Sequence, residues 1–125
     1  MNMAALNLLM TEVPDGLLPD MPIEPKKITA GNPVARGMIL SQSVDKKMTC
    51  GVWSCEPGSF DWDFAWDEFI YVLDGAVTIR EESGEVHTLG PGDSVHFPLG
   101  LRTQWEVTEP VHKFFVLRTP EPFEV

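Results

Sequence analysis

The feature that most constrains this chain is the succession of short β-rich runs that begins at Val34 and is broken by turn residues. None of these runs sustains the apolar period of a helix, and no segment repeats along the chain. Runs of this kind bounded by glycine, proline and aspartate are typical of strands. An all-β sandwich or barrel is therefore the predicted fold class. The expected strands are 48–55, 60–66, 69–73, 76–80, 85–89, 94–97, 101–107 and 111–117.

One of these runs, Phe69 to Leu73, is apolar at every position. That pattern predicts a strand buried on both faces, between a barrel interior and another layer. Asp74-Gly75 is expected to end it, and Gly90-Pro91-Gly92-Asp93 is expected to form a tight turn.

The segment before Val34 holds five of the eleven prolines. This spacing forbids a long helix and favours an extended arm. We therefore expect an arm over residues 1–32 and a barrel over residues 33–125. The apolar residues of the arm are predicted to lie across a sheet of the same or a partner subunit; they are Leu17, Leu18, Met21 and Ile23.

The length of the chain indicates one domain, and its net charge indicates which partners it does not bind. The 125 residues fit one domain, and 19 acidic against 9 basic residues give a net charge of -10. Such a chain repels phosphate backbones and anionic membranes, so neither nucleic acid nor a membrane is an expected partner. No stretch approaches a membrane-spanning length. Met1 to Met10 has no basic leader region, so a cytoplasmic protein is expected.

The spacing of the turns resembles that of the cupin superfamily. Six residues separate Glu68 from Gly75, as in the first cupin motif, and five separate Gly92 from Pro98, as in the second. The resemblance covers about residues 50–118. It implies a cupin-type (RmlC-like) jelly-roll β-barrel with an extended N-terminal arm.

Several segments are similar to a narrower group, the small single-domain cupins that share their domain with ureidoglycine aminohydrolase. These segments are Gly58–Trp62, Asp67-Glu68, Phe97–Arg102, Trp105–Val107 and Val111–Lys113. The resemblance implies a protein that is often dimeric, from a group in which many members have no assigned activity.

The histidine ligands that a catalytic metal needs in a cupin are missing. Depending on the spacer, the first two ligand positions hold Trp62 and Phe64 or Asp61 and Asp63, and the last position holds Thr103. Of the usual four ligands only Glu68 remains, so no cofactor is expected. A divalent metal (manganese, iron, zinc or nickel) would need a site rebuilt from Asp61, Asp63, Glu68 and His96.

Strand parity predicts what replaces the metal site. Thr103 and Trp105 share a face, and Trp62 with Phe64 would join them to form an aromatic cavity around one carboxylate. The expected ligand-binding residues are Trp62, Phe64, Glu68, Tyr71, Thr103 and Trp105. The same aromatic residues could equally be plain core. Glu68 is a candidate general acid or base, or a structural carboxylate near the barrel mouth.

The other chemically active residues are expected on the surface. Parity predicts that Arg102 and Lys113 point outward, where ion pairs would hold them. His87, His96 and His112 are predicted surface residues. Cys50 and Cys55 should face opposite sides of one strand as free thiols, without catalytic chemistry.

Three functions remain open from the sequence. The first is a metal-independent module that binds a small uncharged, aromatic or amine-bearing metabolite. The second is an aminohydrolase-like or isomerase-like enzyme that uses Glu68 for proton transfer. The third is a structural or regulatory subunit whose interior is only core. In each case the two-sided apolar run and the arm predict a homodimer.

Overall fold

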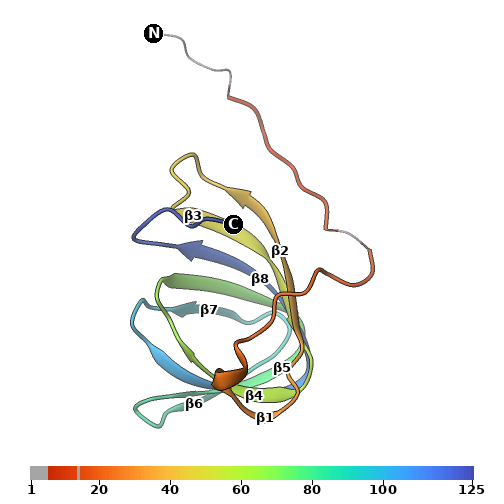
Figure 1. Ribbon diagram of the computed structural model, residues 1–125, viewed down its shortest axis with the longest axis vertical. Coiled ribbons are helices and arrows are strands. Elements are labelled where there is room, and N and C mark those ends of the chain that lie inside the picture. Colours follow the sequence, from red (N-terminus) through yellow and green to blue (C-terminus); the bar gives the residue numbers. More distant parts are fainter. Residues whose placement is uncertain (1–5, 14) are drawn as a thin grey trace.

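The structure is a computed structural model that describes residues 6–13 and 15–125. Residues 1–5 and Pro14, part of the predicted arm, lie outside the described residues. The secondary structure is almost entirely strand (Figure 1). The elements are η1 (Pro25–Lys27), β1 (Ile28–Gly31), β2 (Ala35–Gln42), β3 (Met48–Cys55), β4 (Gly58–Asp63), β5 (Asp67–Glu81), β6 (Val86–Leu89), β7 (Ser94–Phe97) and β8 (Arg102–Arg118).

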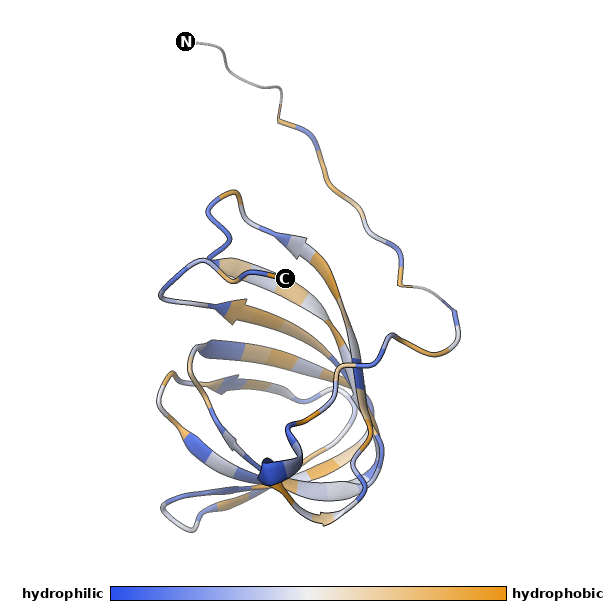
Figure 2. Ribbon diagram, in the orientation of Figure 1, coloured by the Kyte–Doolittle hydropathy of each residue, from blue (hydrophilic) through white to orange (hydrophobic). Residues whose placement is uncertain are grey.

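The strands form one antiparallel sheet curled into a barrel, which confirms the predicted all-β class. Its order is β1-β4-β8-β3-β2, and β5 pairs with β6, β7 and β8. Successive side chains along β5 and β8 alternate between buried and exposed positions. The hydropathy of the strands is shown in Figure 2. The buried set forms one core inside the barrel.

Two strands are longer than the sequence predicted. The runs 69–73 and 76–80 are one strand, β5, and the runs 101–107 and 111–117 are one strand, β8. Asp74-Gly75, which was expected to end a strand, lies opposite residues 108–110, which were expected to separate two strands; the register between β5 and β8 shifts here. Gly75 has φ 83°, and a Cβ there would overlap the carbonyl oxygen of Pro110. These residues therefore form a bulge within a continuous pair of strands and do not end the strands.

The run Phe69 to Leu73 is buried on one face only, so the prediction of two buried faces is wrong for this chain. Ile70 and Val72 point into the core. Phe69, Tyr71 and Leu73 point outward and are 44%, 47% and 51% exposed. No second layer of this chain covers them within the described residues.

Residues 19–21 of the arm run along the edge of β2, and residues 28–31 form β1, which pairs with β4. The Met21 amide donates to the carbonyl of Ala35 at 3.1 Å, and the Gly37 amide donates to the carbonyl of Pro19 at 2.9 Å. Leu18 and Ile23 are buried, Met21 is partly buried, and Leu17 is exposed. Leu18, Met21 and Ile23 thus lie against a sheet of their own subunit, whereas Leu17 does not. Over the described residues, no helix has the length and apolarity that crossing a membrane requires.

Candidate functional site

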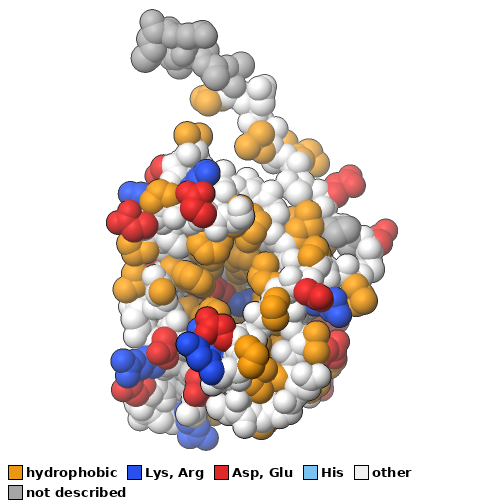
Figure 3. Space-filling view, viewed as in Figure 1, with side chains coloured by type: hydrophobic (Ala, Val, Ile, Leu, Met, Phe, Trp, Pro, Cys, Tyr) orange, Lys and Arg blue, Asp and Glu red, His pale blue; other side chains and the backbone are white. Residues whose placement is uncertain are grey.

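The barrel interior opens to solvent through an apolar cavity. Its volume is about 390 Å³, and most of its walls are aromatic or aliphatic side chains. A space-filling view shows this hollow in the middle of the molecule, surrounded by hydrophobic side chains (Figure 3). The cavity argues against the alternative in which the aromatic interior is only packed core. Its aromatic lining is Trp53, Phe60, Trp62, Phe64, Trp66, Trp105, Phe115 and Phe123.

Two charged side chains lie inside this apolar cavity. The ammonium group of Lys113 donates to Oε2 of Glu68 at 2.6 Å, and both residues are buried. The other carboxylate oxygen, Oε1, accepts from the indole Nε1 of Trp66 at 3.0 Å. Burying either charge alone would be costly, and pairing offsets that cost. Glu68 thus faces the barrel interior, as predicted, and both of its carboxylate oxygens are hydrogen-bonded, one to Trp66 and the other to Lys113.

The Lys113 ammonium also rests among aromatic rings. It lies 4.6 Å from the ring centre of Trp53, 5.1 Å from that of Trp105 and 5.9 Å from that of Phe115. Cation–π attraction of this kind strengthens when water is excluded. The charges of Glu68 and Lys113 therefore cancel within the cavity. The Lys113 ammonium is stabilised by both the Glu68 carboxylate and the aromatic rings.

The inward position of Lys113 corrects the prediction that it points outward. β8 runs unbroken from Arg102 to Arg118, so residues on the same parity as Trp105 face the interior on both sides of the bulge. The expected surface ion pair therefore does not form for Lys113. Arg102 does point outward, and its Nε lies 3.9 Å from Glu82.

The other predicted site residues divide into three groups. Trp62, Phe64 and Trp105 line the cavity with Glu68. Thr103 lies behind the wall, where its hydroxyl donates to the Trp62 carbonyl at 2.7 Å and accepts from Trp105 Nε1 at 3.0 Å. Tyr71 is on the outer surface, so its assignment to the site is wrong. The parity of β5 places Glu68 inside and Tyr71 outside.

The donor set does not fit the metal that many cupins hold. Asp61 and Asp63 alternate outward from β4, whereas Glu68 points inward, so the three carboxylates do not converge. His96 lies on the outer face, where its Nε2 is 3.0 Å from Asp67. The place of a cation beside Glu68 is taken by the Lys113 ammonium. The fallback metal site from Asp61, Asp63, Glu68 and His96 is therefore not assembled.

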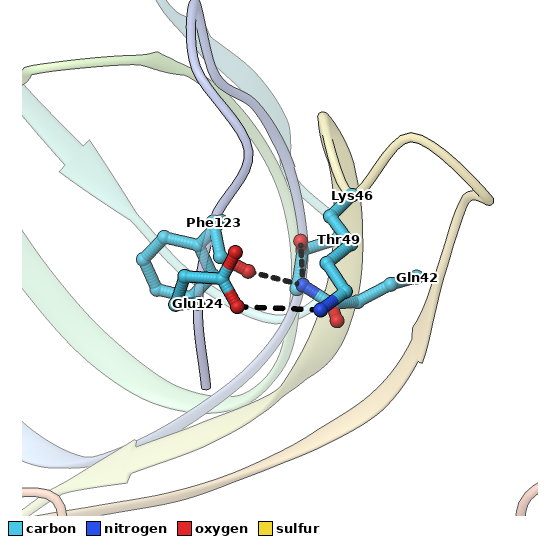
Figure 4. A network of polar contacts seen from close by, with 5 residues as sticks. All are labelled: Gln42, Lys46, Thr49, Phe123 and Glu124. Atoms are coloured by element: carbon cyan, nitrogen blue, oxygen red, sulfur yellow. Dashed lines mark hydrogen bonds and ion pairs between the residues drawn. The ribbon is translucent and has the colours of Figure 1, made fainter.

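The C-terminal segment reaches the mouth of the cavity. Phe123, Glu124 and Val125 are part of the lining, and the Phe123 ring lies edge-on to Trp66 at 5.8 Å. Polar contacts to the β2–β3 hairpin hold this segment (Figure 4). Gln42 donates to the Phe123 carbonyl at 2.7 Å, and Lys46 pairs with Glu124 at 3.2 Å.

Outside the cavity, the described residues contain one group of side chains close enough to share a cation, on the β5–β6 hairpin. Glu81, Glu85 and His87 are partly or fully exposed. His87 Nε2 lies 2.6 Å from Glu81, and this hydrogen bond raises the pKa of His87. A second surface pair joins His96 and Asp67. The hydrogen bond with His96 lowers the pKa of Asp67, and a hydrogen bond donated by the Leu99 amide lowers it further. These are surface pairs rather than part of the cavity.

Comparison with known families places the fold. The model of the EutQ-like cupin domain matches residues 42–115, which is more than half of the chain. The chain belongs to the EutQ-like cupin family. The broader resemblance to cupins is thereby confirmed.

One curated relative of this EutQ-like cupin shares about a quarter of the aligned residues. Acetate kinase EutQ from Clostridioides difficile (strain 630) is 26% identical over 89 residues, which are 69% of this chain and 56% of that protein. The chain thus spans little more than half the length of this curated relative. The solved Clostridium difficile EutQ protein superposes with a TM-score of 0.63 at 23% identity, over 72% of this chain and 66% of that chain.

Two solved structures named for the DUF861 family are also similar to this EutQ-like cupin. A protein from Thermotoga maritima is 41% identical over 51% of this chain and 73% of its own, with a TM-score of 0.50. A protein of unknown function from Pseudomonas syringae pv. tomato str. DC3000 has a TM-score of 0.74 and 25% identity, over 81% of this chain and 43% of its own.

The sequence did not point to several residues that line the cavity of this EutQ-like cupin, among them Lys113, Trp53, Trp66 and Phe123. Lys113 could have been found by continuing the parity of Trp105 through residues 108–110. Trp66 precedes Glu68 by two residues, a spacing that lets the two side chains meet. No pattern in the sequence indicated that Phe123 returns to the barrel mouth.

Proposed function

We propose that this EutQ-like cupin binds a small uncharged, flat metabolite inside its barrel without using a metal. The observation that carries the proposal is the apolar cavity of about 390 Å³ whose buried charges, Glu68 and Lys113, neutralise each other. Its volume lies in the range of small-molecule sites. Flat apolar ligands suit walls made largely of aromatic rings.

Because Glu68 and Lys113 already neutralise each other, the cavity disfavours a charged ligand. A ligand with a net charge would bring an unpaired charge into an apolar space, which costs free energy. An amine would also compete with Lys113 for Glu68, because both would need the same carboxylate. The uncharged class of ligand is therefore favoured over the amine-bearing class.

Thermal unfolding with a ligand panel tests this function. We expect indole, phenol or nicotinamide to raise the melting temperature, and benzoate and benzylamine not to raise it. Saturating ligand at 100 times Kd stabilises the folded state by roughly 2.7 kcal/mol. Trp62→Ala, in the cavity wall, should lose the shift, whereas the matched outer-face change Phe69→Ala should keep it. Shifts that are equal in both variants would contradict the proposal.

A second candidate is an enzyme that uses Glu68 for proton transfer. It is favoured by one observation: Glu68 is buried at the cavity surface, hydrogen-bonded by Trp66 and by an ammonium that can exchange a proton with it. Glu68→Gln with the fold intact is expected to abolish turnover while ligand binding persists. A variant that folds and retains full turnover would remove this candidate.

The cavity gives no support to the acetate kinase activity for which the Clostridioides difficile relative is named. Binding a nucleoside triphosphate calls for several cationic or backbone donors around its phosphates. The described cavity offers Lys113 already paired to Glu68, among apolar walls. We do propose that the chain belongs to the ureidoglycine aminohydrolase cupin group, which the motif segments around Glu68 and Phe97 support.

The cysteines support a cytoplasmic location. Cys50 and Cys55 are both free, and they face opposite sides of β3. Burial raises the pKa of the Cys55 thiol to about 12, so this thiol is unreactive at neutral pH. Free thiols persist most easily in a reducing compartment, such as the cytoplasm.

A further inference from the structure

Lys113 is set apart from the other lysines of the chain. Lys26, Lys46 and Lys47 are exposed, and Lys27 is partly buried over the ring of Trp62. Lys113 alone among the five is buried and lines the cavity. A primary amine that faces an apolar binding space is a potential nucleophile toward whatever enters that space.

Its neighbours form the arrangement that nucleophilic catalysis uses. A nucleophile within hydrogen-bond reach of a base, which a third group orients, is the geometric signature of an activated side chain. Here the Lys113 Nζ is 2.6 Å from Glu68 Oε2, and Trp66 Nε1 fixes the other carboxylate oxygen at 3.0 Å. We propose that Lys113 condenses with the carbonyl group of a small uncharged aldehyde or ketone in the cavity, forming a Schiff base. This inference rests on the proposed function, because the carbonyl compound must first bind there.

The reaction balances without any other reagent. The ammonium of Lys113 gives a proton to Glu68, and the freed nitrogen lone pair attacks the carbonyl carbon. The carbonyl π electrons move to oxygen, which takes up one proton from nitrogen and then the proton from Glu68. The C–O bond breaks and water leaves, so that an aldehyde and an ammonium become a protonated imine and water, with no oxidation or reduction.

The surroundings of Lys113 suit the product as well as the reactant. The protonated imine carries the same single positive charge as the ammonium, so the ion pair with Glu68 is kept. The rings of Trp53 and Trp105, at 4.6 Å and 5.1 Å from Nζ, continue to face a cation. Apolar walls hold little water, which protects an imine from hydrolysis.

Reductive trapping of the folded protein tests the inference. The protein is incubated near neutral pH with benzaldehyde and sodium cyanoborohydride, and modified residues are located by peptide mass spectrometry over time. Lys113 is expected to acquire a benzyl group roughly tenfold or more faster than exposed Lys26, because binding holds the carbonyl beside it. Prior saturation with indole should slow the labelling of Lys113 and leave that of Lys26 unchanged.

Variants separate the roles of the two residues. Lys113→Met should lose the rapid adduct, whereas the control Lys26→Met should keep it. Glu68→Gln should slow labelling of Lys113 and change its pH dependence, with folding checked by circular dichroism. Labelling of surface lysines alone in the wild-type protein would overturn the inference, and this result does not depend on any variant folding.

A non-reactive analogue distinguishes the two possible failures. Benzyl alcohol has nearly the same shape as benzaldehyde but no carbonyl group. If benzyl alcohol raises the melting temperature and Lys113 stays unlabelled by benzaldehyde, the Schiff base is refuted and the binding function survives. If neither compound acts on the cavity, both proposals fail.

Discussion

At the scale of single residues, the Glu68–Lys113 pair is the most consequential feature of the molecule. A buried ion pair is weak evidence of stability, because desolvation of both charges offsets their attraction. An apolar pair of similar size would fill the same space without that cost. The placement of this pair in a cavity wall, instead of in packed core, is therefore what links it to function.

Unfolding by urea tests the coupling within this pair. Glu68→Gln leaves a buried ammonium without its carboxylate and should cost about 3 to 5 kcal/mol of stability. Lys113→Met should also destabilise, because it leaves the carboxylate with Trp66 as its remaining partner. The double variant should be more stable than the sum of the two changes predicts. Strictly additive free energies of unfolding would show that the pair is not coupled.

His87 gives a prediction on pH dependence. Its hydrogen bond to Glu81 raises the histidine pKa above the ordinary 6.5. Because the folded-state pKa is the higher one, the stabilisation is fully present below pH 6.5 and is lost as the pH rises through the raised value. NMR titration of the imidazole should report this pKa, and Glu81→Gln should lower it toward 6.5. An unchanged pKa in that variant would contradict the contact.

At the scale of elements, the long pair of β5 and β8 explains both what the sequence predicted well and what it did not. Alternation placed Glu68, Trp62, Phe64 and Trp105 inside, because side chains of one strand alternate strictly between faces. Lys113 was missed because residues 108–110, which include Pro110, separate the two expected strands. Proline is also tolerated at bulges, and here it faces Gly75 across the register shift.

The approach of Gly75 to Pro110 yields a prediction for these elements. A Cβ at residue 75 would overlap the Pro110 carbonyl, and the positive φ is itself unfavourable for other residues. Gly75→Ala should therefore lower the free energy of unfolding by roughly 2 kcal/mol or more. Gly84→Ala is the matched control: it also has positive φ, but an added Cβ there meets nothing within 4 Å. Equal losses in both variants would show that φ, and not the contact, sets the cost.

At the scale of the whole molecule, the outer face of β5 and β8 is the surface most suited to a second copy of the chain. Tyr71 lies opposite Phe114 in the register, and Phe69 stacks on His96 at 4.3 Å. These side chains are partly exposed although the chain carries a net charge of -10. Two such chains repel one another least where apolar side chains replace charges, so an isologous contact through this face is the expected one.

Sedimentation at micromolar concentration tests the homodimer. We expect a dimer for the wild-type protein and a monomer for Leu73→Glu, which places a charge on the apolar face. Val44→Glu, on the exposed β2–β3 hairpin, is a matched control that should remain dimeric. A wild-type monomer would refute the prediction, and a dimer unaffected by Leu73→Glu would place the interface elsewhere.

The return of the C-terminal segment to the cavity has a practical consequence for work on this protein. Val125 borders the mouth, and Phe123 reaches the rim through Trp66. Any residues attached after Val125 would emerge beside the opening through which a ligand passes. A tag at the other end of the chain would precede the arm, whose described residues 6–13 lie outside the barrel (Figure 1). The position of an affinity tag is therefore an experimental variable, and binding measurements made with the two placements are not interchangeable.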